Sequence, residues 1–349
     1  MTQRTRGFVV RLAVSLSILA FLAVIIDPGA VLDSLRRLRP GWVLAALGVS
    51  VLQVTASAWR WRYTAGRLGV ELPLRRAVSE YYLASFLNQI LPGGVLGDVS
   101  RAWRHARVAS VRSTGGEASL ARSLPSVHAV ILERLSGQVV MIVVAACSAA
   151  FLGGLRAVAV VLAGCLAASL LVRGVRRHAR IPGTASFADN ARAAFGGGAL
   201  PVQLATSLLV VASYLGVYLM GARAVGVQTP AAVLVPLVAP VLVSMLLPVT
   251  VAGWGVREGA AAALWSAVGL PEHDGVAISV VYGLLVLVAT LPGAVIVVLT
   301  LWRGRAPRRT ERRHPDGRRG SAGEAPPRAS RWAGASGTDD PSRGGEEPR

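Results

Sequence analysis

The chain has 349 residues, of which 53% are hydrophobic and only 16% are charged, and its net charge is +19. This composition excludes an ordinary soluble domain and indicates that most of the chain lies in lipid. All 37 basic residues are arginine, which excludes a Walker A phosphate-binding loop and a Schiff-base lysine.

Six apolar runs are each long enough to cross a hydrocarbon core of about 30 Å. They cover residues 8–26, 42–58, 127–151, 157–172, 202–220 and 276–302. The arginines lie mainly in loops beside these runs and in the C-terminal segment, which is typical of cytoplasmic segments that face anionic lipid rather than nucleic acid. We therefore expect a multi-pass protein of the cytoplasmic membrane with both termini in the cytoplasm.

One motif occurs twice, as LPGGVLGDVSR at residues 91–101 and as LPVTVAGWGVR at residues 247–257. The matching positions are Pro92 with Pro248, Gly97 with Gly253, and Arg101 with Arg257. Each copy also has a carboxylate next to or near its arginine, Asp98 in the first and Glu258 in the second. A helix breaker and a charge are both costly in a hydrophobic segment, so their recurrence indicates a functional site at membrane depth.

The two motifs interrupt two further apolar stretches, residues 81–95 and 231–270, which we do not expect to be simple spans. Arginine-rich segments flank 81–95 on both sides, so this stretch is predicted to enter from the cytoplasm and return there. The second stretch is then predicted to enter from outside. Whether these hairpins are re-entrant or full spans stays open at this point.

We therefore expect an all-α integral membrane protein with six full spans plus two re-entrant helical hairpins, arranged as two inverted repeats. The transmembrane domain would cover residues 1–304, with repeats at about 7–151 and 157–302. Inverted repeats of this kind are typical of secondary transporters, whose broken helices meet near the midplane. Residues 305–349 are rich in Arg, Pro, Gly, Ser and Glu and are predicted to be a disordered cytoplasmic tail.

Three segments together resemble the transmembrane domain of lysylphosphatidylglycerol synthases and the wider flippase-like family built on that domain alone. They are SEYYLASFLNQILPGGVLGDVSRAW, VILERLSGQVV and LPVTVAGWGVREGA, and the Arg-Trp-Arg at 60–62 is also similar. The resemblance covers about residues 7–303. It implies movement of lipids, such as aminoacylated phosphatidylglycerol or polyprenyl-linked sugars, between leaflets. The synthase members add a C-terminal acyl-transferase domain where this chain has its predicted tail, so we expect no lipid synthesis and no enzyme.

A flippase must pass a charged head group through hydrocarbon, and guanidinium groups suit a phosphate because they donate two hydrogen bonds at a permanent charge. Breaks at proline and glycine free backbone N–H groups, and a helix that begins after a break favours an anion. The candidate substrate-binding residues are Asn88, Pro92, Gly93, Gly94, Gly97, Asp98, Arg101, Glu133, Arg134, Pro248, Gly253, Gly255, Arg257 and Glu258. We expect no catalytic residue, metal or cofactor.

Structural roles compete with these assignments. Asp98 and Arg101 are three residues apart and could pair on one helical face. Arg257 and Glu258 are adjacent and are not expected to face each other, so each should reach another element. Glu133 and its neighbour lie near the cytoplasmic end of a span, where snorkelling is an equal alternative. If Glu133 is buried, it could pair with either motif arginine.

The leading prediction is a flippase that moves an anionic phospholipid or lipid-linked head group. The alternatives are a secondary transporter of a small anionic solute and a non-catalytic membrane subunit of a lipid-modifying enzyme. The expected partners are membrane lipids and not nucleic acid, while a separate lipid synthase or glycosyltransferase and an oligomer stay open. Transport would be passive or coupled to protons carried by Asp98, Glu133 or Glu258.

Overall fold

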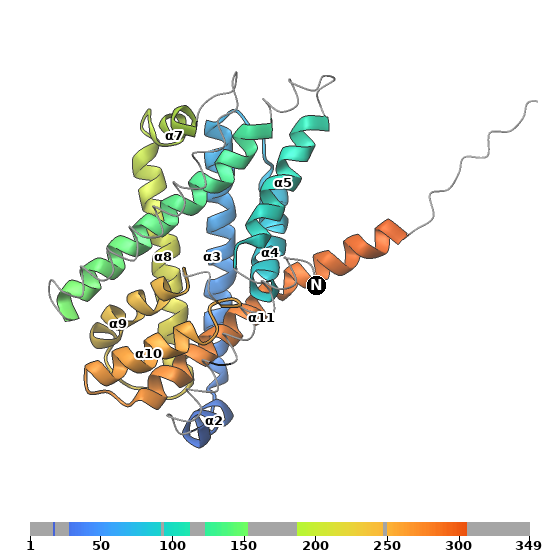
Figure 1. Ribbon diagram of the computed structural model, residues 1–349. Helices are drawn as coiled ribbons and strands as arrows, with labels where there is room; N and C mark the ends of the chain where they lie inside the picture. Colours follow the sequence, from blue (N-terminus) through green and yellow to red (C-terminus); the bar gives the residue numbers. More distant parts are fainter. Residues whose placement is uncertain are drawn as a thin grey trace, which may run out of the picture. The chain divides into compact units, whose positions relative to one another are not determined.

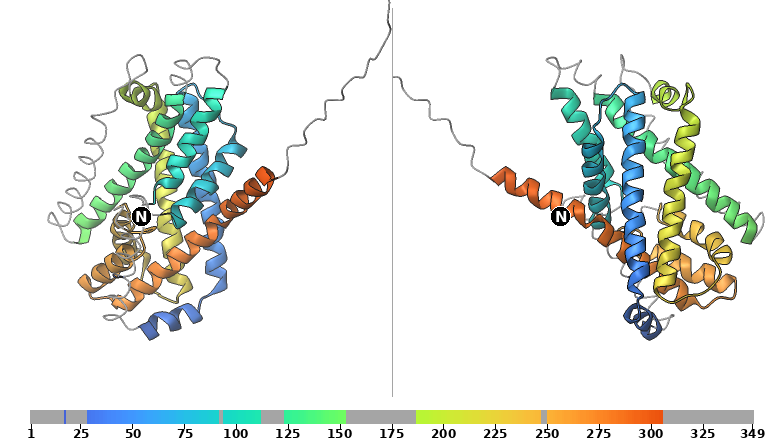
Figure 2. Two further views of the ribbon diagram at one scale, coloured as in Figure 1. Left: turned by 45° about the vertical axis from the view of Figure 1, so that its right-hand side comes forward. Right: turned by 180° about the vertical axis from the view of Figure 1, so that it is seen from behind.

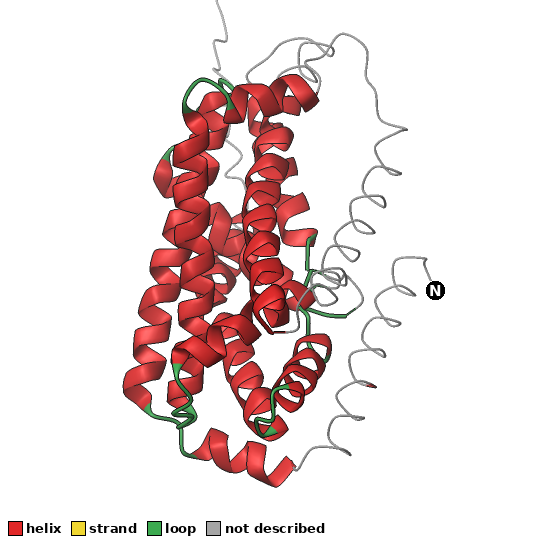
Figure 3. Ribbon diagram, turned by 90° about the vertical axis from the view of Figure 1, so that its left-hand side faces the viewer, coloured by secondary structure: helices red, strands yellow, loops and turns green. Residues whose placement is uncertain are grey.

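The computed structural model describes residues 17, 28–91, 94–111, 123–152, 187–246 and 250–305. The regular elements within these ranges are helices (Figure 3). Four of them are long and apolar enough to cross a membrane: α3 (Pro40–Arg67), the helix Ser123–Leu152, α8 (Ala199–Ala224), and α11 (Glu272–Arg305) over its part Glu272–Thr300.

These four helices contain the predicted spans 42–58, 127–151, 202–220 and nearly all of 276–302, so four of the six predictions are confirmed as apolar helices of spanning length. The predicted spans 8–26 and 157–172 lie outside the described residues, apart from residue 17. The predicted tail, 305–349, also lies outside them, apart from residue 305.

The remaining described helices are shorter. They are α2 (Pro28–Arg36), α4 (Leu74–Ile90), α5 (Leu96–Val111), α7 (Phe187–Phe195), α9 (Ala231–Ser244) and α10 (Val256–Ala267). The pair α4–α5 is joined at the first copy of the repeated motif, and the pair α9–α10 at the second. The second interrupted stretch, 231–270, therefore forms two short helices rather than one long helix. The first pair extends beyond the predicted bounds of 81–95, because α4 begins at Leu74 and α5 continues to Val111 through the arginine-rich segment.

Glycines in the left-handed conformation end three of the helices. Gly69, Gly226 and Gly269 follow α3, α8 and α10 with φ angles of 73°, 91° and 74°. In each case the next residue donates a backbone hydrogen bond to the carbonyl five positions back, for example Val70 to Ala65 at 2.9 Å. This is the Schellman arrangement, which satisfies carbonyls that the helix end leaves free. The glycines thus set where these three helices stop.

Figures 1 and 2 show α3 and α8 side by side, with the two short pairs near opposite ends of them. The pair α4–α5 lies toward the end where α3 finishes, and α9–α10 lies toward the end where α8 finishes. Helix α11 crosses obliquely and packs against α4, α8 and α10. It therefore contacts both short pairs.

Two large apolar clusters follow the same division of the chain. One joins α3, α4, α5 and the helix Ser123–Leu152 around Trp61 and Tyr81, and the other mainly joins α8, α9, α10 and α11 around Leu237 and Trp265. The outer faces of the long helices carry exposed leucines and valines, as on α8 at four-residue spacing. Such faces suit contact with lipid chains rather than with water.

Candidate functional site

The beginning of α5 is held against α4 by Gly97 and Asn88. A Cβ atom at position 97 would lie 1.9 Å from the carbonyl oxygen of Ala84, so only glycine allows this approach. The Gly97 N–H donates to Asn88 Oδ1 at 2.7 Å, and Asn88 Nδ2 donates to Asp98 Oδ2 at 2.9 Å. Asn88 therefore satisfies a free donor at the helix start and orients the carboxylate of Asp98.

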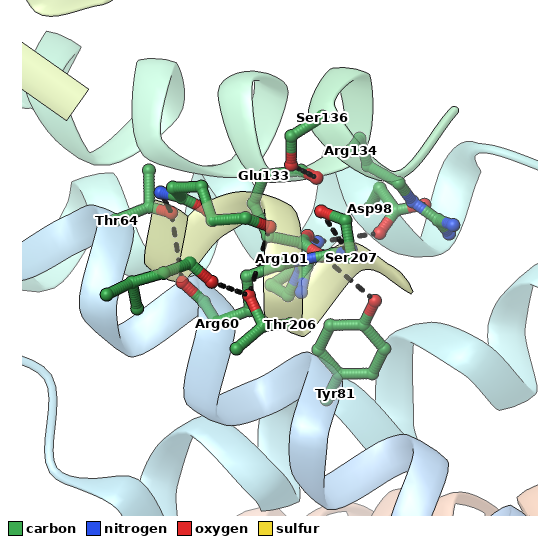
Figure 4. Close-up of polar contacts among 12 residues, drawn as sticks. Arg60, Thr64, Tyr81, Asp98, Arg101, Glu133, Arg134, Ser136, Thr206 and Ser207 are labelled. Carbon is green, nitrogen blue, oxygen red and sulfur yellow. Dashed lines mark hydrogen bonds and ion pairs between the residues drawn. The ribbon is translucent and has the colours of Figure 1, made fainter. Parts of the chain in front are cut away.

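Five charged side chains form one buried network, which we call the charged cluster. They are Arg60, Asp98, Arg101, Glu133 and Arg134. They come from α3, from α5 and from the helix Ser123–Leu152, and Figure 4 shows them converging. Three guanidinium groups against two carboxylates leave the cluster with a net charge of +1.

Glu133 lies at the centre of the charged cluster and is fully buried. It accepts hydrogen bonds from Arg60 Nη2 at 2.6 Å, Arg101 Nη2 at 3.1 Å and the Tyr81 hydroxyl at 3.3 Å (Figure 4). Arg60 also donates to Ser207 on α8 at 3.1 Å, which links the cluster to a fourth helix. Glu133 is therefore not a snorkelling residue, and its predicted pairing with a motif arginine is confirmed for Arg101.

Arg101 is enclosed rather than presented to a ligand. It donates to Asp98 at 3.0 Å, which confirms the predicted pair at three-residue spacing. Its guanidinium carbon lies 4.5 Å from the ring centroids of both Trp61 and Tyr81, and its exposed fraction is zero. The two rings stabilise the cation by cation–π contact. Arg101 thus holds the first motif together from inside.

The second motif repeats this enclosure without the surplus charge. Arg257 lies over the rings of Trp254 and Tyr282, at 4.9 and 5.3 Å, and donates to Glu258 Oε1 from Nη2 at 2.5 Å. Ser279 on α11 binds both residues, and Glu258 also accepts from the Gly255 N–H at 2.7 Å. This second pair is neutral and at most 2% exposed.

The expectation that Arg257 and Glu258 could not meet is therefore wrong. Glu258 is the third residue of α10 and curls back to the N–H of the residue that precedes the helix. This rotation brings its carboxylate beside the long arginine side chain. Adjacency prevents contact only between side chains that extend straight outward from a regular helix.

A cavity of about 600 Å³ lies between the two motifs. The first motif contributes Gly94, Val95 and Asp98 to its wall, and the second contributes Thr250, Ala252 and Gly253. Most of the rest comes from α3, α4, α8, α11 and the helix Ser123–Leu152, with smaller parts from α5 and the end of α9, and it mixes apolar side chains with amides and hydroxyls. Mostly apolar cavities with a few placed polar groups are typical of ligand sites.

The cavity divides the predicted site residues into two groups. Those that line it are Asn88, Gly94, Asp98, Arg134 and Gly253. Those described residues that lie outside its lining are Gly97, Arg101, Glu133, Gly255, Arg257 and Glu258. Pro92, Gly93 and Pro248 fall outside the described residues. Ligand binding by the candidate residues therefore stays a prediction, and it now concerns the five residues that line the cavity.

Arg134 is the most accessible cation of the charged cluster. Its side chain is 35% exposed, compared with 4% for Arg60, and both residues line the cavity. Two of its nitrogens donate to Asp98 Oδ2, including a contact from Nε at 2.8 Å.

Two residues of the site, Arg60 and Tyr81, were not predicted from the sequence. Arg60 follows directly after a long apolar run, and this position could have identified it as a candidate for a buried charge.

Two titratable groups of α5, a helix outside the four spanning ones, have shifted pKa values. Burial raises the pKa of the Asp98 carboxyl, but the positive charges of Arg134 and Arg101 outweigh it and hold the pKa below its usual range. Burial, followed by the charges of Arg76 and Arg101, lowers the pKa of His105 to about 4. Near neutral pH, Asp98 is therefore ionised and His105 is uncharged. In the described ranges, no group of three or more metal-binding side chains lies together.

The family model described as the lysylphosphatidylglycerol synthase TM region matches residues 8–293 of this chain. The match covers most of the sequence, so the chain belongs to this family, as the three sequence segments had indicated. Together with the four apolar helices, it identifies a multi-pass membrane protein of lipid metabolism or transport. A comparison with curated proteins gives no match.

Proposed function

We propose that this member of the lysylphosphatidylglycerol synthase TM-region family is a flippase for a lipid with an anionic head group. The observation that carries the proposal is the net positive charged cluster, which forms one wall of a cavity inside an apolar helical body. A head group would enter this cavity while its acyl chains stay in the bilayer. The protein would be a transporter of the cytoplasmic membrane, with both termini in the cytoplasm, and not an enzyme.

The lengths of the short helices support the predicted re-entrant hairpins, on which the predicted inverted repeats depend. Helices α4, α5, α9 and α10 have 17, 16, 14 and 12 residues. At about 1.5 Å per residue they reach roughly 18–26 Å, which is less than the bilayer core of about 30 Å. Each pair would thus enter the membrane from one face and return to it, as two inverted repeats require.

Charge balance supports an anion as cargo. A buried charge without a partner is costly in a bilayer, about 2.5–3.5 kcal/mol on insertion scales. The charged cluster has one more guanidinium than carboxylate, and Arg134 extends into the cavity. An anionic phosphate would complete the balance and receive charge-assisted hydrogen bonds from Arg134. The neutral pair at the second motif offers no such excess, so one head group would bind at a time.

Liposomes with acyl-labelled fluorescent phosphatidylglycerol test the proposal directly. Wild-type protein should allow the labelled lipid to exchange between the two leaflets. Dithionite, which quenches only the label in the outer leaflet, measures the rate of this exchange. Arg134→Gln removes the excess charge and should lower the exchange rate at least about tenfold, the loss of about 1.4 kcal/mol. Arg134→Lys keeps the charge and should retain most of the rate, which separates charge from folding.

Arg192→Gln is the matched control, since Arg192 pairs with Asp189 at the surface and its side chain is 79% exposed. It should exchange lipid as fast as wild type. Equal rates for Arg134→Gln and Arg192→Gln would show that the charged cluster does not carry the head group. No exchange by wild-type protein would overturn the proposed function itself.

A further inference from the structure

Three glutamine side chains line the cavity without a hydrogen-bond partner in the described part of the chain. Gln53 lies on α3, Gln89 on α4 and Gln138 on the helix Ser123–Leu152, and all three are half-buried. Other glutamines of the described chain do have partners. Gln203 donates to Thr64 at 2.9 Å, and Gln228 donates to the carbonyl of Gly226 at 3.3 Å. The free amides are therefore gathered at the cavity.

A second kind of polar group without a partner lines the same cavity, at the second motif. The Thr250 hydroxyl at the second motif lines the cavity, is 2% exposed, and has no hydrogen-bond partner among the described residues. A primary amide offers two donors and an acceptor with two lone pairs, and a hydroxyl both donates and accepts. Burying the Thr250 hydroxyl without a partner is costly, and the three amides of the same cavity have unused donors and acceptors, so the lining suits a ligand that supplies both donors and acceptors. Hydroxyl groups on a head group meet this requirement.

The carboxylates of the site are already engaged. Among the described residues that line the cavity, Asp98 is the one carboxylate, and it accepts from Asn88, Arg101 and Arg134. Glu133 is fully buried behind it between Arg60 and Arg101. An ammonium group on a ligand would therefore meet a net positive wall whose carboxylates are already paired. Like charges at such a site repel.

We propose that the cavity selects a phosphodiester head group that carries hydroxyl groups and one net negative charge. Glycerol and sugar phosphodiesters belong to this class. The phosphate lies at Arg134, and the hydroxyls bind the amides of Gln53, Gln89 and Gln138 and the hydroxyl of Thr250. Head groups without hydroxyls leave the amides unpaired, and head groups with an added amine meet the positive wall. This selectivity rests on the proposed lipid transport.

Three acyl-labelled lipids in the same liposome assay separate the two requirements. Phosphatidylglycerol has both hydroxyls and one negative charge. Phosphatidylpropanol keeps the charge and loses the hydroxyls, and lysylphosphatidylglycerol keeps a hydroxyl and gains amines. Wild-type protein should exchange phosphatidylglycerol about 5- to 150-fold faster than phosphatidylpropanol, because two neutral hydrogen bonds contribute about 1–3 kcal/mol. It should also exchange phosphatidylglycerol faster than lysylphosphatidylglycerol, because the added amines are repelled by the net positive wall.

The double variant Gln53→Leu with Gln138→Leu tests the amides themselves. It should lower the ratio of the phosphatidylglycerol rate to the phosphatidylpropanol rate several-fold, because two of the three amides that bind the hydroxyls are lost. Gln228→Leu, at an exposed loop glutamine, is the matched control and should keep the wild-type preference.

The outcomes distinguish this selectivity from the transport on which it rests. Equal wild-type rates for all three lipids, or a faster rate for lysylphosphatidylglycerol, would overturn the selectivity and leave lipid transport standing. A double variant that keeps the wild-type preference for phosphatidylglycerol over phosphatidylpropanol would show that the amides do not bind the hydroxyls. A wild-type protein that moves none of the three lipids would overturn the transport as well.

Discussion

Glu133→Gln should destabilise the protein strongly, because it removes the central negative charge of the charged cluster without changing its shape. Glu133 is fully buried between the guanidiniums of Arg60 and Arg101, at 2.6 and 3.1 Å. The side chains of those two arginines are 4% and 0% exposed, so neither can recover hydration. Removing one partner from a buried ion pair costs about 3–5 kcal/mol. For a domain of about 300 residues that corresponds to a fall in melting temperature of at least about 5 °C.

Thermal unfolding of the purified protein in detergent, followed by the fluorescence of its eight tryptophans, measures this fall. Glu80→Gln is the matched control, because Glu80 pairs with Arg104 at 2.7 Å where both side chains are partly exposed, at 19% and 28%. A pair of that kind contributes about 1 kcal/mol or less, or a few degrees at most. Adding Arg60→Gln to Glu133→Gln should recover part of the loss by removing one uncompensated cation. Equal melting temperatures for the two single variants would refute the argument.

Two further predictions concern α5. Gly97→Ala should prevent the close approach of α5 to α4, since the new methyl group would lie 1.9 Å from the carbonyl oxygen of Ala84, and the melting temperature should fall by several degrees. Gly48→Ala, on an open face of α3 with no atom within 4 Å, is its control and should leave stability unchanged or slightly higher; equal effects would contradict the close packing. The folded-state pKa of His105, about 4 compared with 6.5 for a free imidazole, means that the unfolded chain binds the proton more readily. Stability should therefore fall as pH is lowered from about 6.5 toward 4, and His105→Gln should reduce this slope in melting temperatures measured across that window.

Local spacing along the chain predicted one pair of the charged cluster, and the presence of a carboxylate within an apolar run suggested a second. Asp98 and Arg101 were expected to pair because three-residue spacing places side chains on one helical face, and they do so at 3.0 Å. Glu133 was expected to pair with a motif arginine if buried, and it contacts Arg101. Arg60 was missed because its partner is 73 residues away in the sequence. No local pattern encodes a contact between distant helices.

The repeated motif shows where such reasoning fails. The two copies match at proline, glycine and arginine, which suggested two equivalent ligand sites. Both arginines are in fact enclosed between a tryptophan and a tyrosine, and neither lines the cavity. The aromatic partners of Arg101 come from α3 and α4, and Tyr282 comes from α11. Their positions depend on packing between helices, which the motif does not contain.

The sequence by itself determined that the chain is apolar and helical, where four long helices run, and that two apolar stretches break at the same motif. Those properties follow from hydrophobicity, length and helix-breaking residues, each of which acts within one segment. Only the tertiary structure decided that Arg134 and three glutamines line the cavity while Arg101 and Arg257 are enclosed. Burial and charge balance depend on side chains brought together from different helices, so the arginines of the motif support the site from behind while other residues of both copies line the cavity.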